Sequence, residues 1–328
     1  MITFNKASDK DFKVLNLTDF QLMAGELDAE NQKGKIFRYT LDTLVERSKP
    51  DLITITGDLA WGGDYDAISV LGPILDSYNI PWAPIWGNHD QDRGLDRLDK
   101  SISLLLQNKH FVYENGPKEL GRGNYVIAIK QDDKIVHALI MMDTHDRVPN
   151  LKSGIENDRS WAKLTPEQIE WYKERVRELI ALGCTESTLL VHIPIYAYRE
   201  AFAKAFKDGL NPKEITMKQS YEADIWNEGY KDSYGVKYED VCSYYEDDGV
   251  FDAIKELNHT KNVICGHDHI NSFSIMHKGV RLTFAVKTGP GCYWNEEING
   301  GTILTIDKNG SLSTCHEIVD ISHITKAE

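Results

Sequence analysis

The first half of the chain alternates short apolar runs with longer segments whose apolar residues recur every three or four positions. Short apolar runs are typical of buried strands, and the spaced segments are typical of amphipathic helices. Strands are predicted at Val14 to Leu17, Leu52 to Thr56 and Trp82 to Trp86. Helices are predicted over 35–47, 67–78 and 95–106. Gly72-Pro73 is expected to break or kink the second helix. Strands that alternate with helices predict a layered α/β domain.

The second half follows a less regular pattern. Two apolar runs, Tyr125 to Ile129 and Ile135 to Met142, flank Asp132-Asp133 and predict a hairpin. A helix is predicted from Thr165 to about Leu182, because Thr-Pro-Glu-Gln can form a capping box with proline in the first turn. The remaining predictions are a strand over 187–193, a helix from Val250, a strand over 262–265 and further strands towards the end.

Residues 194–250 are the least regular part of the chain. Between Tyr221 and Asp252, six tyrosines and ten acidic residues accompany only two lysines. Two interpretations stay open: a solvated, partly ordered insertion, or a lid or wall beside a functional site, since long loops in compact domains are often functional. No internal repeat and no Gly/Ser linker occurs, so residues 1–328 are expected to form one domain that carries this insertion.

Composition and charge narrow the class of partner. Of the 328 residues, 41% are hydrophobic and 27% are charged, as in ordinary globular proteins. The 51 acidic and 37 basic residues give a net charge of −14. Nucleic acid is therefore not expected as a partner, because phosphate backbones need clustered Lys and Arg. A small phosphorylated substrate or a phosphoprotein is compatible with this charge if metal ions supply positive charge locally.

The N-terminus and the cysteines bear on the cellular compartment. The N-terminus is charged where a signal peptide needs an apolar run, and no stretch approaches the ~20 apolar residues of a transmembrane helix. We therefore expect a cytoplasmic protein with no membrane partner. The five cysteines are widely spaced and form no CxxC motif, which predicts reduced thiols that pack as small core hydrophobes.

Residues that can bind metals stand at the ends of five predicted strands. They are Asp19 and Gln21, then Asp58, then Asn88 and His89, then His192, then His267, Asp268 and His269. Ligand sites in open α/β sheets lie outside the carboxyl ends of the strands, so these side chains are expected at one edge. A lone histidine after an apolar strand is more often a hydrogen-bonded core residue. The whole ordered set of carboxylates, imidazoles and an amide oxygen instead suits a pair of Mn, Fe or Zn ions.

The ordered motifs resemble those of the calcineurin-like metallophosphoesterase superfamily. They are Asp19-x-Gln21, Gly57-Asp58, Gly87-Asn88-His89-Asp90, Val191-His192 and Gly266-His267-Asp268-His269, within a resemblance over about residues 13–307. The stretches 86–91, 142–143, 235–239, 248–251 and 266–271 are most similar to the purple-acid-phosphatase-like branch that includes Dcr-type phosphatases of yeast and plants. The resemblance implies a four-layer α/β/β/α sandwich with two central mixed sheets.

The resemblance also implies a chemistry. The metal ligands would be Asp19 and His269 for the first ion, Asn88, His192 and His267 for the second, and Asp58 as a bridge. His89 would be a general acid or a residue just outside the ligand set. Asp58 and His89 would thus be catalytic. A hydroxide bridging two ions ~3.5–4 Å apart would attack phosphorus in line. The implied enzyme is a dinuclear-metal phosphatase.

Two positions depart from the superfamily pattern. The first motif usually reads Asp-x-His, whereas this chain has Gln21, so this position is either a weaker oxygen ligand or no ligand. Purple acid phosphatases have a tyrosine three residues after the aspartate of Gly-Asp, whereas this chain has Trp61, so no tyrosinate–iron colour is expected. Two alternative functions stay open: a phosphodiesterase of the same fold, and a metal-binding protein with weakened catalysis.

Several residues lie beside the motifs. His145 is interpreted as a surface or core residue that could reach a substrate. Asp143 is interpreted as a hydrogen-bond acceptor rather than a ligand. Asp90, Asp268 and Asn271 could orient the histidines of their own motifs, as partners outside the ligand set commonly do.

Overall fold

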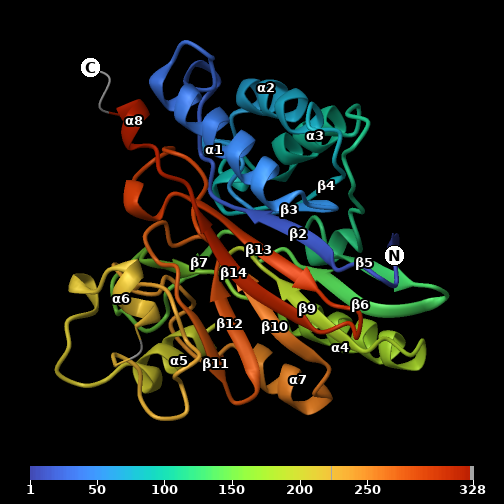
Figure 1. The fold of residues 1–328 in the computed structure, drawn as a ribbon, viewed down its shortest axis with the longest axis vertical. Helices are drawn as coiled ribbons and strands as arrows, with labels where there is room; N and C mark the ends of the chain where they lie inside the picture. The colour runs from blue at the N-terminus through green and yellow to red at the C-terminus, as the bar shows by residue number, and fades with distance from the viewer. Residues whose placement is uncertain (223, 326–328) are drawn as a thin grey trace.

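Two β-sheets lie face to face at the centre of the computed structural model, which describes residues 1–222 and 224–325 (Figure 1). In spatial order, the seven-stranded sheet consists of β1 (Ile2–Lys6), β5 (Tyr125–Gln131), β6 (Lys134–Met141), β9 (Glu186–Leu190), β10 (Thr260–Cys265), β12 (Val280–Phe284) and β11 (Ser274–His277). The five-stranded sheet consists of β14 (Leu312–Ile318), β13 (Gly300–Ile306), β2 (Phe12–Leu17), β3 (Leu52–Thr56) and β4 (Trp82–Ile85). A separate two-stranded sheet is formed by β7 (Arg147–Pro149) and β8 (Arg159–Trp161).

Helices cover the outer face of each large sheet. Figure 1 shows on one side α1 (Gln32–Ser48), α2 (Tyr65–Asp76) and α3 (Leu95–Leu105), and on the other α4 (Pro166–Ala181), α5 (Ala197–Ala205) and α7 (Val250–Leu257). Among the described residues, two short α-helices follow elsewhere in the chain, α6 (Met217–Tyr221) and α8 (Ser322–Thr325). The resulting order of layers confirms the expected α/β/β/α sandwich. Within the described part of the chain, no helix combines the length and the apolar character needed to span a bilayer.

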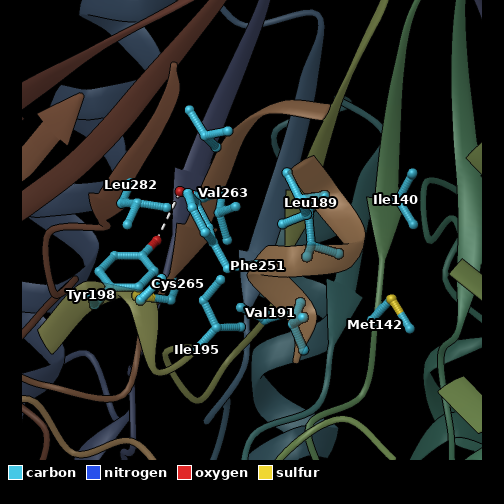
Figure 2. Close-up of a cluster of buried hydrophobic side chains, with 14 of the residues drawn as sticks. Ile140, Met142, Leu189, Val191, Ile195, Tyr198, Phe251, Val263, Cys265 and Leu282 are labelled. Carbon is cyan, nitrogen blue, oxygen red and sulfur yellow. Dashed lines mark hydrogen bonds between the residues drawn. The ribbon is translucent and has the colours of Figure 1, made fainter. Parts of the chain in front are cut away.

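Each boundary between layers has its own apolar cluster. The cluster between the sheets includes Val14, Leu52, Leu190, Ile264 and Leu304. Outside the seven-stranded sheet, the strand residues Leu189, Val263 and Leu282, together with Val191 just after β9, meet Tyr198 of α5 and Phe251 of α7 (Figure 2). The Tyr198 hydroxyl donates a hydrogen bond to the Val263 carbonyl at 2.8 Å, so this buried polar atom is satisfied. Burial of a large aliphatic side chain stabilises a fold by about 1.5–3 kcal/mol, so the clusters hold the layers together.

Most predicted elements occur where the pattern placed them, but α2 differs in one respect. It runs unbroken through Pro73, because buried Leu71 and Leu75 pack in the same cluster as Leu98 of α3 and so compensate for the lost backbone hydrogen bond. The start of α4 follows the prediction, since Thr165 forms a capping box with Gln168.

Several elements were not predicted, among them β1, β7, β8, α5, α6 and α8. β1 is a short edge strand whose residues alternate between exposed and half-buried positions, and it pairs in parallel with β5. α5 lies inside the stretch expected to be irregular. Its buried Tyr198, Ala201, Phe202 and Ala205 follow the three- and four-residue spacing of a helix, so the signal was present in the sequence.

Buried His137 predicts a loss of stability in acid. Its Nδ1 donates to the Gly310 carbonyl at 2.7 Å and its Nε2 accepts from the Thr188 hydroxyl at 2.9 Å, which is the pattern of a neutral ring. Burial lowers the pKa of His137 from 6.5 to about 4. Between these two pH values the unfolded chain binds more protons than the folded protein. The contribution of His137 to stability is therefore fully present above about pH 6.5 and is lost as the pH falls towards 4.

Titration of His137 is expected to lower the free energy of unfolding by about 3 kcal/mol by pH 4, because each unit of pKa difference corresponds to about 1.36 kcal/mol. Urea unfolding at pH 7 and at pH 4.5 measures it. His137→Gln keeps a donor and an acceptor but cannot titrate, so its stability should depend less steeply on pH. Equal pH dependence in the variant and the wild type would contradict this explanation.

Candidate metal centre

The carboxyl ends of strands from both large sheets meet at one place. In the five-stranded sheet, β2, β3 and β4 run parallel and end just before Asp19, Asp58 and Asn88. In the seven-stranded sheet, β9 and β10 also run parallel and end just before His192 and His267. The structure therefore brings together all eight residues predicted as ligands or catalytic groups: Asp19, Gln21, Asp58, Asn88, His89, His192, His267 and His269.

The first group of facing atoms involves two carboxylates and one imidazole. Asp19, Asp58 and His269 each offer a ligand atom, and these atoms lie within 4.8 Å of one another. The Nε2 atom of His269 is 3.6 Å from Oδ1 of Asp19. All three side chains are buried. These are the residues implied for the first metal, including the bridging carboxylate.

The second group surrounds Nε2 of His192. This atom lies 3.4 Å from Oδ1 of Asp58, 3.1 Å from Oδ1 of Asn88 and 3.3 Å from Nδ1 of His267. These are the residues implied for the second metal. Asp58 belongs to both groups, so it occupies the place that a bridging carboxylate needs.

The outer nitrogens of two histidines are already committed to backbone carbonyls. Nδ1 of His192 donates to the Thr56 carbonyl at 2.7 Å, and Nδ1 of His269 donates to the Tyr293 carbonyl at 2.8 Å. In the neutral rings, each Nε2 therefore directs a lone pair at a carboxylate oxygen. Such an arrangement is repulsive unless a cation or a proton lies between the two atoms, and it is the usual arrangement of metal-binding histidines.

Unsatisfied buried atoms also fit metal ions. Oδ1 of Asp19, Oε1 of Gln21 and Nε2 of His267 are buried and make no hydrogen bond within the described residues. Buried polar atoms normally have a partner, and exceptions need an explanation. Carboxylate and imidazole donors suit Mn, Fe and Zn. The residues present therefore fit the metals that the fold family implies.

The electrostatics of the cluster favour added positive charge. Burial raises the pKa of Asp19. Burial has the same tendency at Asp58, but the His192 imidazole outweighs it and holds the pKa of Asp58 well below its ordinary value. Burial disfavours charge on His192, yet Asp58 and Asp19 raise the pKa of His192 to about 10. Two buried carboxylates thus demand a cation, and a metal pair would meet that demand with neutral imidazoles.

Backbone strain is concentrated at the same residues. Asp19, Asp58 and His267 have φ values of 56°, 56° and 79°, a region that non-glycine residues rarely adopt. Each such residue costs of order 1–3 kcal/mol, so the surrounding fold must impose these conformations. The glycines before the motifs serve different needs. Gly57 has a φ of 92°, whereas Gly266 is needed for space, since a Cβ there would clash with the Thr18 hydroxyl.

Asp90 does not orient His89, contrary to the sequence-based hypothesis. Its carboxylate accepts hydrogen bonds from the backbone N–H groups of Asp58 at 2.9 Å and Gly87 at 2.8 Å, and so ties together the loops after β3 and β4. The partner of His89 is Asp92, whose Oδ2 is 2.7 Å from Nδ1 of the imidazole. Asp92, three residues after His89, therefore takes the orienting role that was expected of Asp90.

Asp268 and Asn271 likewise serve a loop rather than the motif histidines. The Asp268 carboxylate accepts from the Cys242 backbone N–H at 3.2 Å and from Nδ2 of Asn271 at 3.0 Å. Oδ1 of Asn271 in turn accepts from the Tyr238 backbone N–H at 3.1 Å. This pair fixes residues 238–242 against the site. Asp143 is a hydrogen-bond acceptor as predicted, with the Arg122 backbone N–H at 2.8 Å.

A cavity of about 270 Å³ opens onto the cluster. Besides predicted residues, its lining includes residues that the sequence did not indicate as functional: Arg147, Trp161, Cys242, Cys292 and Tyr293. They come from separate segments that no motif connects. Cys242 belongs to the 194–250 stretch, so part of this stretch forms a wall of the site, which is the second of the two interpretations given for it.

Aromatic rings and a buried lysine support the histidines and Asp19. The Tyr293 ring stacks on His269 at 4.1 Å between centroids, and the Trp61 ring lies 4.4 Å from His89. The Lys287 ammonium is buried and donates to the Asp19 backbone carbonyl. No spacing rule links Lys287 to the first motif 268 residues earlier, so sequence analysis missed it.

The cysteine prediction is correct on pairing and partly wrong on burial. All five thiols are free. Cys184 and Cys265 are buried as expected of small core hydrophobes, whereas Cys292 and Cys315 are exposed. Cys292 has a φ of 55° and lies on the loop beside Tyr293. Its loop position explains the exposure of Cys292, whereas Cys315 lies on the exposed face of the edge strand β14.

Comparisons with known proteins identify the family. A family model described as calcineurin-like phosphoesterase matches residues 12–271. "Probable inactive purple acid phosphatase 28" of Arabidopsis thaliana is 25% identical over 320 residues, which cover 87% of this chain and 72% of that protein. Phosphatase DCR2 of Saccharomyces cerevisiae is 25% identical over 292 residues, covering 80% of this chain but only 45% of the yeast protein. These relatives confirm the expected similarity to the purple-acid-phosphatase-like branch.

A solved structure shares the fold. The crystal structure of a dimetal phosphatase from Danio rerio superposes with a TM-score of 0.53 at 12% identity, over 93% of this chain and 98% of that one. At this identity the likeness concerns the fold alone. The family match, in contrast, spans most of the chain, including the five strand ends that carry the motifs. The chain therefore belongs to the calcineurin-like phosphoesterase family.

Proposed function

We propose that this protein is a phosphatase that hydrolyses a phosphate ester with two metal ions, Mn, Fe or Zn. The observation that carries the proposal is the pair of Nε2 atoms, in His192 and His269, that face carboxylate oxygens at 3.4 and 3.6 Å beneath an open cavity. The substrate would be a small phosphorylated molecule or a phosphoprotein, because the protein's own charge of −14 offers no field for a larger polyanion.

The proposed metal ligands follow the two groups of facing atoms. Asp19 and His269 would hold the first ion, Asn88, His192 and His267 the second, and Asp58 both. Two ions held by these residues would supply Lewis acidity to the phosphoryl oxygens and would lower the pKa of an attacking water. The protein's own part is to fix these side chains, and the carbonyls of Thr56 and Tyr293 do so by holding the imidazoles in one orientation.

His89 is the proposed proton donor to the leaving group. Its ring lines the cavity, lies against Trp61 and has Nδ1 bound to Asp92, so Nε2 is the nitrogen available to a substrate. The backbone N–H of His89 donates to Oδ1 of Asp58 at 2.9 Å, which fixes the residue next to the cluster. General acid catalysis requires a donor within hydrogen-bond reach of the leaving group, and Nε2 of His89 is the atom that would fill this role.

The main alternative is a metal-binding protein with weakened catalysis. Gln21 and the names of several relatives, which include the word inactive, favour it. The retained His89 and the complete remaining ligand set favour catalysis. Turnover of para-nitrophenyl phosphate and of the bis ester, with Mn added, separates the possibilities: monoester hydrolysis supports a phosphatase, faster diester hydrolysis a phosphodiesterase, and no turnover the weakened protein.

Gln21 predicts a weakened first metal site. Nε2 of Gln21 donates to Oδ2 of Asp58 at 2.5 Å, so its amide faces the cluster without adding charge. An imidazole binds Mn, Fe and Zn more strongly than an amide oxygen. We expect Gln21→His to raise the metal affinity of the first site by at least ~10-fold, which is the usual effect of a contact outside the ligand set. Activity should then depend less on added metal.

Titration of metal into the apo protein measures this effect. Gln21→Ala is the matched control, because it removes the hydrogen bond to Asp58 without adding a nitrogen ligand. Gln21→His is expected to bind the first ion more tightly than the wild type does. If Gln21→His and the wild type bind the first ion equally, residue 21 does not control the metal and only hydrogen-bonds its neighbour.

A further inference from the structure

A second cavity, of about 370 Å³, lies beside the metal cavity. Its lining is mostly apolar and comes largely from the β7–β8 hairpin and the residues just after it. It is lined by the apolar residues Val148, Pro149, Leu151, Ala162 and Pro166, by Tyr244, and by the polar residues His145, Arg147, Lys163 and Thr165. We call this cavity the hairpin pocket. Nothing in the chemistry of the metal centre requires an apolar chamber at this position.

Arg147 lines both cavities and so marks the boundary between them. Its guanidinium lies over the Trp161 ring at 4.1 Å, and Trp161 meets the His267 ring edge-on at 4.2 Å between centroids. The backbone carbonyl of Arg147 accepts a hydrogen bond from Nη2 of Arg159 at 2.7 Å, which ties the two strands of the hairpin. The hairpin thus holds one positive charge close to a predicted metal ligand.

The charge of Arg147 is available to a ligand. Among residues 1–222 and 224–325, no carboxylate lies within ion-pair distance of its guanidinium, whereas Lys152 on the same hairpin pairs with Glu246. Arg147 is also the only arginine or lysine among the described residues that line the metal cavity. A guanidinium matches the geometry of phosphate oxygens and can bind two of them at once.

The walls of the hairpin pocket are fastened to each other. The Lys152–Glu246 ion pair joins the hairpin to the 194–250 stretch, and the Lys163 ammonium lies 4.3 Å from the centroid of the Tyr244 ring. At the rim, the Leu151 side chain is 85% exposed. An exposed leucine on the rim of an otherwise apolar pocket is a feature of binding sites for apolar groups.

We infer that the hairpin pocket binds the organic part of the substrate, that this part is an aryl group, and that Arg147 binds the phosphate at the boundary. The inference rests on the proposed function, because it places the phosphate in the metal cavity. His145, Lys163 and Thr165 contribute polar atoms, but most of the lining surface is apolar, which suits flat apolar rings better than the hydroxyls of a sugar. The substrate class is therefore aryl phosphate esters rather than polyol phosphates.

Binding of phosphonates, which cannot be hydrolysed, tests the inference by calorimetry on the metal-loaded protein. Methylphosphonate probes the phosphate position alone, and 2-naphthylmethylphosphonate adds an aryl group. We expect the naphthyl compound to bind about 30-fold more tightly, since burial of one aromatic group contributes on the order of 2 kcal/mol.

A matched pair of variants locates the aryl group. Leu151→Asp puts a charge on the rim of the hairpin pocket, and Ile155→Asp puts the same charge on the same hairpin, at a residue that is 69% exposed and lines neither cavity. Both residues are exposed, so neither change threatens the fold. Leu151→Asp should remove most of the aryl preference, Ile155→Asp should keep it, and both should bind methylphosphonate as the wild type does.

Arg147→Met tests the phosphate contact. It should weaken binding of both phosphonates by about the same factor, on the order of 10-fold, because a charge-assisted hydrogen bond is lost from both complexes. Equal affinity for the two phosphonates, or no binding of either, would overturn the inference even if phosphate esters are hydrolysed. Preferential aryl binding without any ester hydrolysis would refute the proposed function and leave the hairpin pocket only as a binding site for aryl groups, so the two failures are distinguishable.

Discussion

Asp58→Asn is expected to lose at least about 10³-fold in phosphate-ester hydrolysis and to weaken the binding of both metal ions. The Asp58 carboxylate is buried, belongs to both groups of facing atoms and is held in the charged form by His192. Asparagine keeps the shape of the side chain and removes its charge. Each ion would then lose a negatively charged ligand. The expected fall in rate corresponds to the loss of several kcal/mol of Lewis-acid stabilisation of the transition state.

Metal content and turnover of para-nitrophenyl phosphate, measured on the same sample, check this expectation. Asp143→Asn is the matched control, because Asp143 is also a buried carboxylate near a strand end but binds the Arg122 backbone N–H and not the metal cluster. The control should keep both metals. Near-normal turnover in Asp58→Asn, with a circular dichroism spectrum like that of the wild type, would refute the bridging assignment.

His89→Ala is expected to keep both metals and to lose about 10²- to 10⁴-fold in rate, which is the usual contribution of a general acid. The side chain is tied to Asp92 rather than to a ligand residue, so its removal leaves the cluster intact. A leaving group that is already acidic needs less protonation. The loss should therefore be smaller for para-nitrophenyl phosphate than for phenyl phosphate.

Comparison of the two esters distinguishes the roles that His89 can have. Equal losses would indicate that His89 stabilises charge and does not donate a proton. Loss of one metal would show that His89 is a ligand. Asp92→Asn offers an intermediate case, since it keeps the imidazole but removes the charge from its partner at 2.7 Å, and it should reduce the rate less than His89→Ala.

The candidate site could be predicted because each motif residue directly follows a strand. A strand end fixes where the next two or three side chains lie, so Asp19, Asp58 and His267 reach one edge whatever the intervening segments do. Apolar runs and helical spacing report burial, so they predicted a layered α/β domain, whereas the α/β/β/α order with two central sheets was implied only by the family resemblance. β1 escaped notice because an edge strand buries too little to leave such a pattern.

The surroundings of the site could not be predicted in the same way. Arg147, Trp161 and Tyr293 reach the cavity from separate loops, and their positions depend on tertiary packing rather than on local spacing. Asp90 illustrates the same limit. Sequence proximity suggested His89 as its partner, but the backbone N–H groups of two loops outcompete the adjacent imidazole for its carboxylate.

The central claim is that this chain binds two metal ions in one cluster. The measurement that tests it most directly is elemental analysis of protein purified without chelator and then loaded with excess Mn or Zn, with unbound metal removed. The shared position of Asp58 between the Asp19–His269 group and the His192 group predicts two ions per chain. One ion or none per chain in the fully loaded protein would contradict the claim.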